Sequence, residues 1–274
     1  MFRDVIKPLL RRSLSPRSYE MLRIAHWYTG YYVPRSIASP FTKRHPAVHG
    51  FGNPGVLGPL VKQIEGVNAL APTRMCRVMT RHGSDKAKWW HNYTSVYSVL
   101  FAELLQRPLR IFELGLGTNN PSLVSSMGTY GQPGASLRGW RELFPKALVY
   151  GADIDRDVLF ESERIKTYYC DQLDQGAIAQ LWGERDFEQG LDVIIEDGLH
   201  TFEGNVSFLQ GSIGHLRPGG YYVVEDIQSS LIGKWKEFLA RECVERYPAL
   251  ALALVELPNT SNSFDNNLLV IRRG

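Results

Sequence analysis

The sequence predicts an α/β protein with a doubly wound, Rossmann-like sheet, and two observations lead to this. After residue 110, short apolar runs rich in β-branched residues alternate with segments of helical length, which is typical of a parallel sheet with helices on both faces. The last two apolar runs are separated only by a short polar loop, which predicts an antiparallel hairpin. We therefore expect a seven-stranded, mostly parallel sheet with a C-terminal antiparallel hairpin.

The expected strands follow a helix in the middle of the chain. Apolar residues recur at three- and four-residue spacing over residues 89–105 and stop before Pro108, which predicts an amphipathic helix. The apolar runs after it have the lengths of strands and are bounded by turn-forming residues. The seven expected strands are residues 110–114, 147–154, 166–170, 191–196, 220–225, 250–257 and 267–272.

The composition indicates one large core with an appended segment. The chain has 274 residues, of which 44% are hydrophobic and 22% charged, and this is an ordinary globular composition. Residues 1–50 contain nine Lys and Arg against two acids, a net charge of +7 in a chain of net charge +3. We predict a basic, aromatic N-terminal extension over residues 1–75, irregular over residues 36–72, and one domain over residues 76–274. The extension could pack on a partner, a membrane surface, a nucleic acid or a phosphate-bearing substrate.

The compartment follows from what the sequence does not contain. No apolar run reaches the roughly 18 residues that a membrane span needs, and the first residues are interrupted by charge and by Pro8. The three cysteines have neither zinc-ligand spacing nor the pattern of a disulfide framework. We expect a cytoplasmic protein without a transmembrane segment.

Two of the expected strands end in carboxylates. One apolar run is followed by Asp197 and the other by Glu225 and Asp226, so all three acids are expected at the carboxyl edge of the sheet. Clustered acids repel one another unless a cation neutralises them, and oxygen ligands favour Mg²⁺, Mn²⁺ or Ca²⁺. His200 follows Asp197 by three residues, as either a base beside the metal or a cap of the next helix. The alternative for Glu225 and Asp226 is a solvated strand end with a cap.

The tips of the earlier strands predict a second binding site. Gly115 and Gly117 allow a tight turn and a close backbone approach to a ligand, and Glu113 before them suits a cationic ligand. Asp153, at the tip of the second strand, could bind both hydroxyls of a ribose. Asp171, after the third strand, could accept a hydrogen bond from an adenine amino group.

Three smaller features have more than one interpretation. Asp155 also follows the second strand, but it is expected to cap the next helix. The segment 131–136 breaks a helical stretch and is either a lid above the ligand or a plain surface turn. Trp89, Trp90 and Tyr93 either cover the ligand or belong to the core.

These motifs together resemble those of a known enzyme class. Residues 113–117, 216–220, Asp153 and Asp171 are similar to the successive motifs of class I S-adenosylmethionine-dependent methyltransferases. More narrowly, the chain over residues 80–273 resembles the metal-dependent macrolide-sugar O-methyltransferases and the cephalosporin-hydroxylase-like family grouped with them. The segments that carry this narrower resemblance are residues 82–86, 91–93, 195–200 and 224–226.

The resemblance implies a reaction and roles for individual residues. Asp197, Glu225 and Asp226 would hold Mg²⁺, or Mn²⁺ in its place, and His200 would be the catalytic base. The cofactor would be S-adenosylmethionine, held by Glu113, Gly115, Gly117, Asp153 and Asp171.

The acceptor implied by the resemblance is a hydroxyl of a sugar or a glycosylated natural product. Catechol O-methyltransferases are also similar, with a lysine at the place of His200, so a catechol-like acceptor is an alternative, as is a non-catalytic S-adenosylmethionine-binding scaffold. Nucleic-acid methylation is disfavoured because residues 196–199 replace the Asn/Asp-Pro-Pro-aromatic turn. An iron oxygenase is disfavoured because only His200 is expected near the acids. We expect a homo-oligomer that binds a small molecule.

Overall fold

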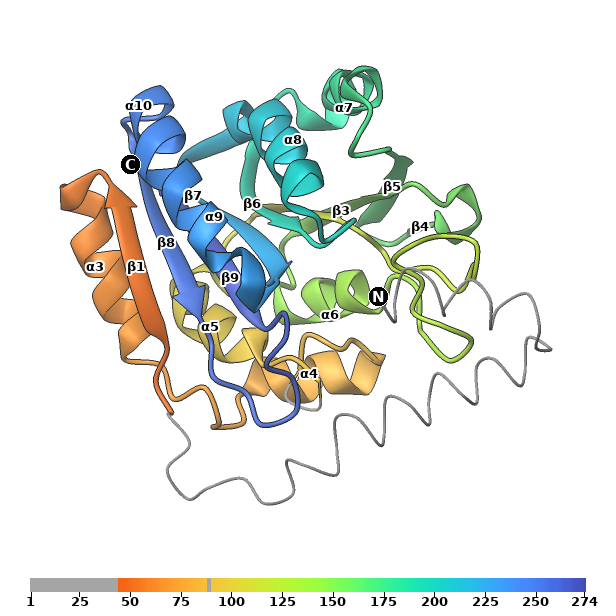
Figure 1. Cartoon of the computed structure of the whole chain (residues 1–274). Helices are drawn as coiled ribbons and strands as arrows, with labels where there is room; N and C mark the ends of the chain where they lie inside the picture. The colour runs from red at the N-terminus through yellow and green to blue at the C-terminus, as the bar shows by residue number, and fades with distance from the viewer. Residues whose placement is uncertain (1–43, 88–89) are drawn as a thin grey trace, which may run out of the picture. The chain divides into compact units, whose positions relative to one another are not determined.

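Nine strands form a single sheet in the computed structural model, which describes residues 44–87 and 90–274 (Figure 1). The strand order is β1-β8-β9-β7-β6-β2-β3-β5-β4. The five strands from β7 to β5 are mutually parallel, and the strands outside them pair antiparallel. The strands are β1 (Ala47–Gly52), β2 (Arg110–Leu114), β3 (Leu148–Asp153), β4 (Glu161–Ser162), β5 (Ile165–Tyr169), β6 (Leu191–Glu196), β7 (Leu216–Ile227), β8 (Leu250–Glu256) and β9 (Asn267–Arg273).

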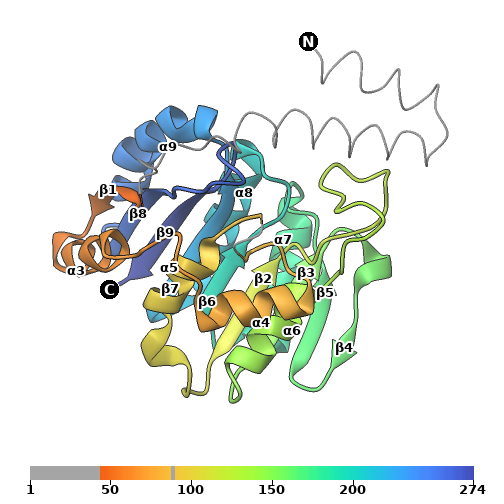
Figure 2. The ribbon, with the colours of Figure 1, turned by 90° about the horizontal axis from the view of Figure 1, so that it is seen from below.

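Helices cover both faces of the sheet (Figures 1 and 2). One buried cluster contains residues of α3, α4, α5 and α6, and the other contains residues of α7, α8 and α9. The strands supply both clusters by alternation, since Ile111 and Ile195 face the first while Phe112 and Ile194 face the second. The helices are α3 (Pro54–Glu65), α4 (Arg74–His82), α5 (Tyr93–Leu100), α6 (Ala135–Leu143), α7 (Gln175–Trp182), α8 (Phe202–Ser212), α9 (Ile232–Phe238) and α10 (Val244–Arg246).

The predicted number of seven strands is wrong because the sheet is extended at both edges. β4, of two residues, adds to β5 on one side, and β1 adds to β8 on the other. Neither segment has the long apolar run of a central strand. The seven predicted segments correspond to β2, β3, β5, β6, β7, β8 and β9, with ends that differ by a few residues.

The prediction of an irregular segment over residues 36–72 is wrong for its described part. β1 is followed at once by α3, whose first turn is capped by the Asn53 side chain and has Pro54 at its start. Both elements belong to a compact unit that spans residues 43–274. The predicted boundary at residue 75 falls within this unit, in α4, and most of the basic extension, residues 1–43, lies outside the described residues.

The predicted helix over residues 89–105 is shorter in the structure. α5 begins after Asn92 and ends at Leu100, and a short 3₁₀ turn, Ala102–Leu104, follows it. Residue 89 lies outside the described part of the chain. Among the helices that are described, none has both the length and the apolar character to cross a bilayer.

Candidate active site

The site lies at the edge of the sheet where the parallel strands end. In the register of the sheet, Leu114 of β2 is the partner of Ala152 in β3 and of Glu196 in β6, and Glu196 is the partner of Val224 in β7. The residues that follow these positions are therefore brought to one edge. All the predicted site residues except Glu113 lie at or just beyond these strand ends.

The turn after β2 requires glycine at two positions. Gly115 has φ +90°, and a Cβ atom there would be 1.9 Å from the carbonyl oxygen of Asp197. Gly117 has φ +77°, and its Cβ would be 2.1 Å from the sulfur of Met127. A side chain is thus disfavoured at both positions by the backbone conformation, and at Gly115 also by the close approach of the ends of β2 and β6.

Asp153 ends β3 directly beside this turn. Its Oδ2 accepts a hydrogen bond from the Leu116 amide at 2.7 Å, and its Oδ1 accepts one from the Asp155 amide at 2.9 Å. Burial raises the pKa of its carboxyl. Asp155 accepts a hydrogen bond from the Asp157 amide at 3.0 Å, so the predicted capping role is confirmed for a 3₁₀ turn, Arg156–Val158. Both acids are bonded to the glycine turn, Asp153 through the Leu116 amide and Asp155 through the Thr118 hydroxyl.

Two polar residues follow β5, the predicted Asp171 and its neighbour Gln172. The half-buried Asp171 accepts a hydrogen bond from the Leu173 amide at 2.9 Å. Gln172 is buried, accepts from the Leu199 amide at 2.6 Å and donates to Glu196 at 3.2 Å. Gln172 therefore holds the loop that contains Asp197 and His200. No sequence signal singled it out, because amide side chains are common in turns.

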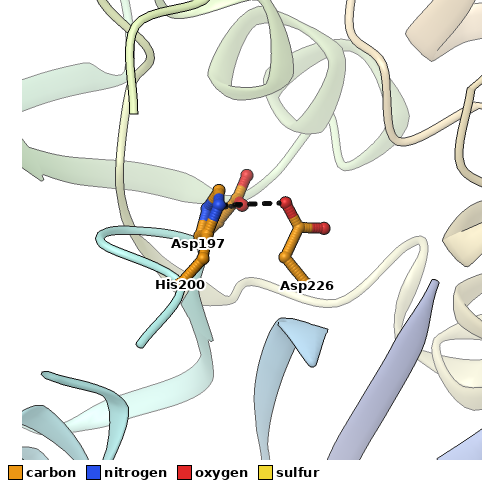
Figure 3. Close-up of side chains that lie close together, drawn as sticks. All are labelled: Asp197, His200 and Asp226. Carbon is orange, nitrogen blue, oxygen red and sulfur yellow. Dashed lines mark hydrogen bonds and ion pairs between the residues drawn. The ribbon is translucent and has the colours of Figure 1, made fainter. Parts of the chain in front are cut away.

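Asp197, His200 and Asp226 converge at this edge (Figure 3). His200 Nε2 lies 3.1 Å from Asp197 Oδ1, and His200 Nδ1 lies 3.3 Å from Asp226 Oδ2. One potential ligand atom from each residue lies within 4.8 Å of the other two. His200 and Asp226 both have left-handed backbone conformations, with φ +59° and +54°. Such backbone strain in non-glycine residues costs about 1 to 3 kcal/mol each and is concentrated at functional sites.

The two carboxylates dominate the chemistry of His200. Burial alone would lower the pKa of the imidazole, but Asp226 and Asp197 outweigh it and raise this pKa to about 10. Burial likewise opposes ionisation of Asp197, but Lys86 and His200 hold its pKa below the usual value. In this arrangement His200 is an imidazolium at neutral pH, and its positive charge occupies the place between two acids where a cation is favoured.

Glu225, the third predicted metal ligand, is directed elsewhere in this structure. Its Oε2 lies 2.5 Å from Lys86 Nζ, and its Oε1 accepts a hydrogen bond from the Tyr97 hydroxyl. Asp226 is the next residue along the chain, and its left-handed backbone breaks the alternation of the strand, so that it contacts Tyr93 while Glu225 contacts Tyr97, both in α5. The structure thus brings together Asp197 and Asp226 with His200, and it places Glu225 beside them against Lys86.

Lys86 is a site residue to which the sequence prediction gave no role. Its side chain is buried, donates to Asp197 and Glu225, and lies 3.5 Å from Glu113 Oε1. Burial would lower the pKa of the ammonium, but the carboxylates of Asp197, Glu113 and Glu225 raise it well above its ordinary value. Residues 82–86 carry part of the family resemblance, but nothing in their sequence indicates a contact with Asp197, 111 residues away.

Glu113 lies beneath the glycine turn and is fully buried. Its carboxylate accepts hydrogen bonds from Ser136 and, at 2.5 Å, from the Trp140 indole. Burial raises the pKa of this carboxyl. Both oxygens are therefore used within the protein, which gives Glu113 a supporting position under the turn. Its direct contact with a cofactor stays a prediction.

A second histidine lies near the acids, so the expectation that only His200 does is wrong. His91 Nε2 is 3.4 Å from Asp226 Oδ1, and the His91 ring stacks on Tyr93 with centroids 4.6 Å apart. Tyr93 donates a hydrogen bond to the same oxygen at 2.6 Å. His91 precedes α5 and is far from Asp226 in sequence, which is why spacing alone could not reveal it. Tyr93 itself is buried, in agreement with the core alternative.

Known proteins with sequences similar to this chain are O-methyltransferases. The chain is similar to the 8-demethyl-8-alpha-L-rhamnosyl tetracenomycin-C 2'-O-methyltransferase of Streptomyces olivaceus, with 33% identity over 177 residues, 63% of this chain and 43% of that protein. It is also similar to the demethylmacrocin O-methyltransferase of Streptomyces fradiae, with 33% identity over 145 residues, 51% of this chain and 33% of that protein. The predicted resemblance to sugar O-methyltransferases is confirmed. The chain spans less than half the length of these relatives.

A solved structure has the same fold. The MycE methyltransferase of the mycinamycin biosynthetic pathway, in complex with Mg and SAH, aligns with a TM-score of 0.54 and 22% identity, over 75% of this chain and 56% of that one. The chain therefore has the mixed α/β fold of a methyltransferase. No family model matches the sequence.

Proposed function

We propose that the protein is a metal-dependent O-methyltransferase that transfers a methyl group from S-adenosylmethionine to a hydroxyl of a sugar or a glycosylated natural product. The observation that carries this proposal is the convergence of Asp197, His200 and Asp226 at the sheet edge, next to the glycine turn at Gly115. The relatives support the acceptor class, because their names describe O-methyltransferases of rhamnosyl tetracenomycin and of demethylmacrocin.

The cofactor is proposed to bind along the glycine turn. Gly115 and Gly117 form the turn, and Asp153 presents a carboxylate beside it for the ribose hydroxyls. Asp171 is proposed to accept from the adenine amino group. Glu113 would act from beneath, by fixing the turn through Ser136 and Trp140.

Asp197 and Asp226 are proposed to hold the divalent cation, with Glu225 at its side. Two carboxylates and one imidazole within reach of one another suit Mg²⁺ or Mn²⁺ in their preference for oxygen. When bound, such a cation supplies positive charge in place of the imidazolium proton and lowers the pKa of a coordinated hydroxyl.

His200 is proposed to accept the proton of the acceptor hydroxyl. The new bond joins the hydroxyl oxygen to the methyl carbon while the bond from that carbon to the sulfonium sulfur breaks, in one in-line displacement. Because both ring nitrogens of His200 face Asp197 and Asp226 in this structure, the imidazole would take up the released proton only in its neutral form, which a cation held by the two acids would favour. Asp197 and His200 keep 19% and 29% of their side chains exposed, so an acceptor hydroxyl can reach them.

Methyl transfer to a panel of glycosylated acceptors, with Mg²⁺ and with excess chelator, tests this proposal. We expect turnover only with the metal. His200→Ala should bind S-adenosylmethionine normally in a calorimetric titration but lose about 10²- to 10⁴-fold in rate. The matched control is His215→Gln, because His215 stacks on Trp182, away from the site, and this variant should keep full turnover.

Two results would count against the proposal. Full turnover in excess chelator would exclude the metal dependence. Normal cofactor binding without transfer to any acceptor, with or without metal, would instead favour a non-catalytic scaffold.

The compartment, the oligomeric state and the role of the N-terminal extension are also proposals. We infer a cytoplasmic homo-oligomer that acts on a small molecule rather than on nucleic acid, with the extension before residue 44 serving assembly or acceptor access. The basic, aromatic composition of residues 1–43 supports a docking role. Removal of residues 1–35 should change the mass in solution or the acceptor affinity and leave cofactor binding intact.

A further inference from the structure

Lys86 is the buried cation of the site, and the proposed mechanism does not use it. Its ammonium contacts Asp197 Oδ2 and lies 2.5 Å from Glu225 Oε2 and 3.5 Å from Glu113 Oε1. Only about 2% of its side chain is exposed to solvent. A buried ammonium is costly unless carboxylates surround it, so this arrangement is a closed ionic cluster.

Asp197 belongs to this cluster and to the proposed metal site at once. Its Oδ2 is used by Lys86, and its Oδ1 faces His200 and the proposed cation position. A divalent cation held by Asp197 and Asp226 would therefore share one carboxylate with the ammonium. Even in a medium as polar as water, repulsion between a unit charge and a divalent ion about 5 Å apart weakens binding roughly tenfold.

We propose that Lys86 is a positioning residue whose ammonium competes with the divalent cation for the carboxylates of Asp197 and Glu225, and thereby weakens metal binding. This inference rests on the proposed metal dependence. Its consequence is an exchangeable metal: the site keeps its shape without the ion, because the lysine holds the acids together. The cluster also reaches Glu113, so the same ammonium connects the glycine turn to the metal ligands.

The test is the affinity for Mn²⁺, measured without cofactor by the paramagnetic resonance of the free ion. Lys86→Met should bind Mn²⁺ at least about tenfold more tightly than the wild-type protein. The double variant Lys86→Met with Glu113→Gln restores the net charge and changes no proposed metal ligand. Its Mn²⁺ affinity should return to within about threefold of wild type. The matched control is Lys166→Met, which removes an exposed ion pair with Asp186 and should change nothing.

Each outcome separates this inference from the proposed function. Wild-type protein that binds no Mn²⁺ would refute the metal dependence itself. Wild-type binding with equal or weaker binding by Lys86→Met would refute the role of the lysine alone, as would a double variant that binds as tightly as the single one.

Folding supplies a second readout if the single variant is unstable. When Lys86→Met is unfolded in chelator, Mn²⁺ should restore the folded state, because the ion can replace the missing charge. Failure of saturating Mn²⁺ to fold it would show that the two cations are not interchangeable, and the inference would fall.

Discussion

The buried carboxyl of Glu196 should make the stability of the protein depend on pH. It ends β6, next to Asp197, and is fully buried. Its Oε1 accepts hydrogen bonds from the Gln172 amide and the Gly198 amide, both at 3.2 Å, while Oε2 has no hydrogen-bond partner among the described residues. Burial raises the pKa of this carboxyl from 4.5 to about 7.

The change in the free energy of unfolding with pH follows from the difference in proton binding between the folded and unfolded states. The folded protein holds the proton of Glu196 more tightly than the unfolded chain does. Its contribution to stability is therefore complete below pH 4.5 and is lost as the pH rises through about 7. One pKa unit corresponds to about 1.4 kcal/mol, so the full loss is about 3 kcal/mol.

Glu196→Gln should remove this loss. The amide oxygen can keep both hydrogen bonds of Oε1, and no charge remains to be desolvated. Urea unfolding in chelator should give the variant and the wild-type protein similar free energies of unfolding near pH 4.5. At pH 8 the variant should be more stable by about 3 kcal/mol.

The comparison with wild type removes the contributions of other titrating groups. The exposed Glu184→Gln is the matched control and should leave the difference near zero at every pH. A gain of the Glu196 variant that does not vary with pH, or no gain at pH 8, would show that the buried carboxyl does not titrate as described.

Three further substitutions test the site. Asp153→Ala should weaken S-adenosylmethionine binding by about 1.5 to 3 kcal/mol in a calorimetric titration, through the loss of charge-assisted hydrogen bonds; unchanged affinity would exclude its ribose role. Gly115→Ala should lower the free energy of unfolding by at least about 2 kcal/mol, because its Cβ would meet the Asp197 carbonyl at a left-handed φ; a normal melting temperature would contradict this. Tyr93→Phe should destabilise the protein by about 1 to 3 kcal/mol and reduce Mn²⁺ affinity, since it deprives Asp226 of a buried donor, and equal Mn²⁺ binding would place Tyr93 in the core alone.

The central strands could be predicted from the sequence because burial on both faces leaves a clear local signal. β2 and β6 lie where the apolar runs placed them, at Arg110–Leu114 and Leu191–Glu196. β1 could not be found in this way, because His49 and Gly50 interrupt its apolar pattern and its partner β8 lies about 200 residues later. Its existence depends on tertiary pairing, which overrides local preference.

In the candidate site, too, contacts between residues close in sequence could be predicted, and contacts that depend on the tertiary fold could not. Asp197 and His200 are three residues apart, so a strand followed by a turn was enough to place them together. Asp226 joins them because its backbone is left-handed, whereas Glu225 does not. The residue type at position 226 gives no indication of this conformation. Lys86 lies in the segment between α4 and α5 and meets Asp197 and Glu225 only through the tertiary fold, so its place in the site could not be predicted from the sequence. The roles of these residues stay predictions.

The pairing of β1 with β8 has a consequence for the solubility of the chain. β8 is an apolar segment, Leu250–Glu256, with six buried residues, and β1 covers its outer backbone along six residue pairs. A chain that began at residue 76 would leave this hydrophobic strand as an open edge. Such an edge recruits strands from other molecules and leads to aggregation. β1 becomes the edge of the described sheet in its place, and because it is more exposed and is interrupted by His49 and Gly50, it is a weaker template for such pairing.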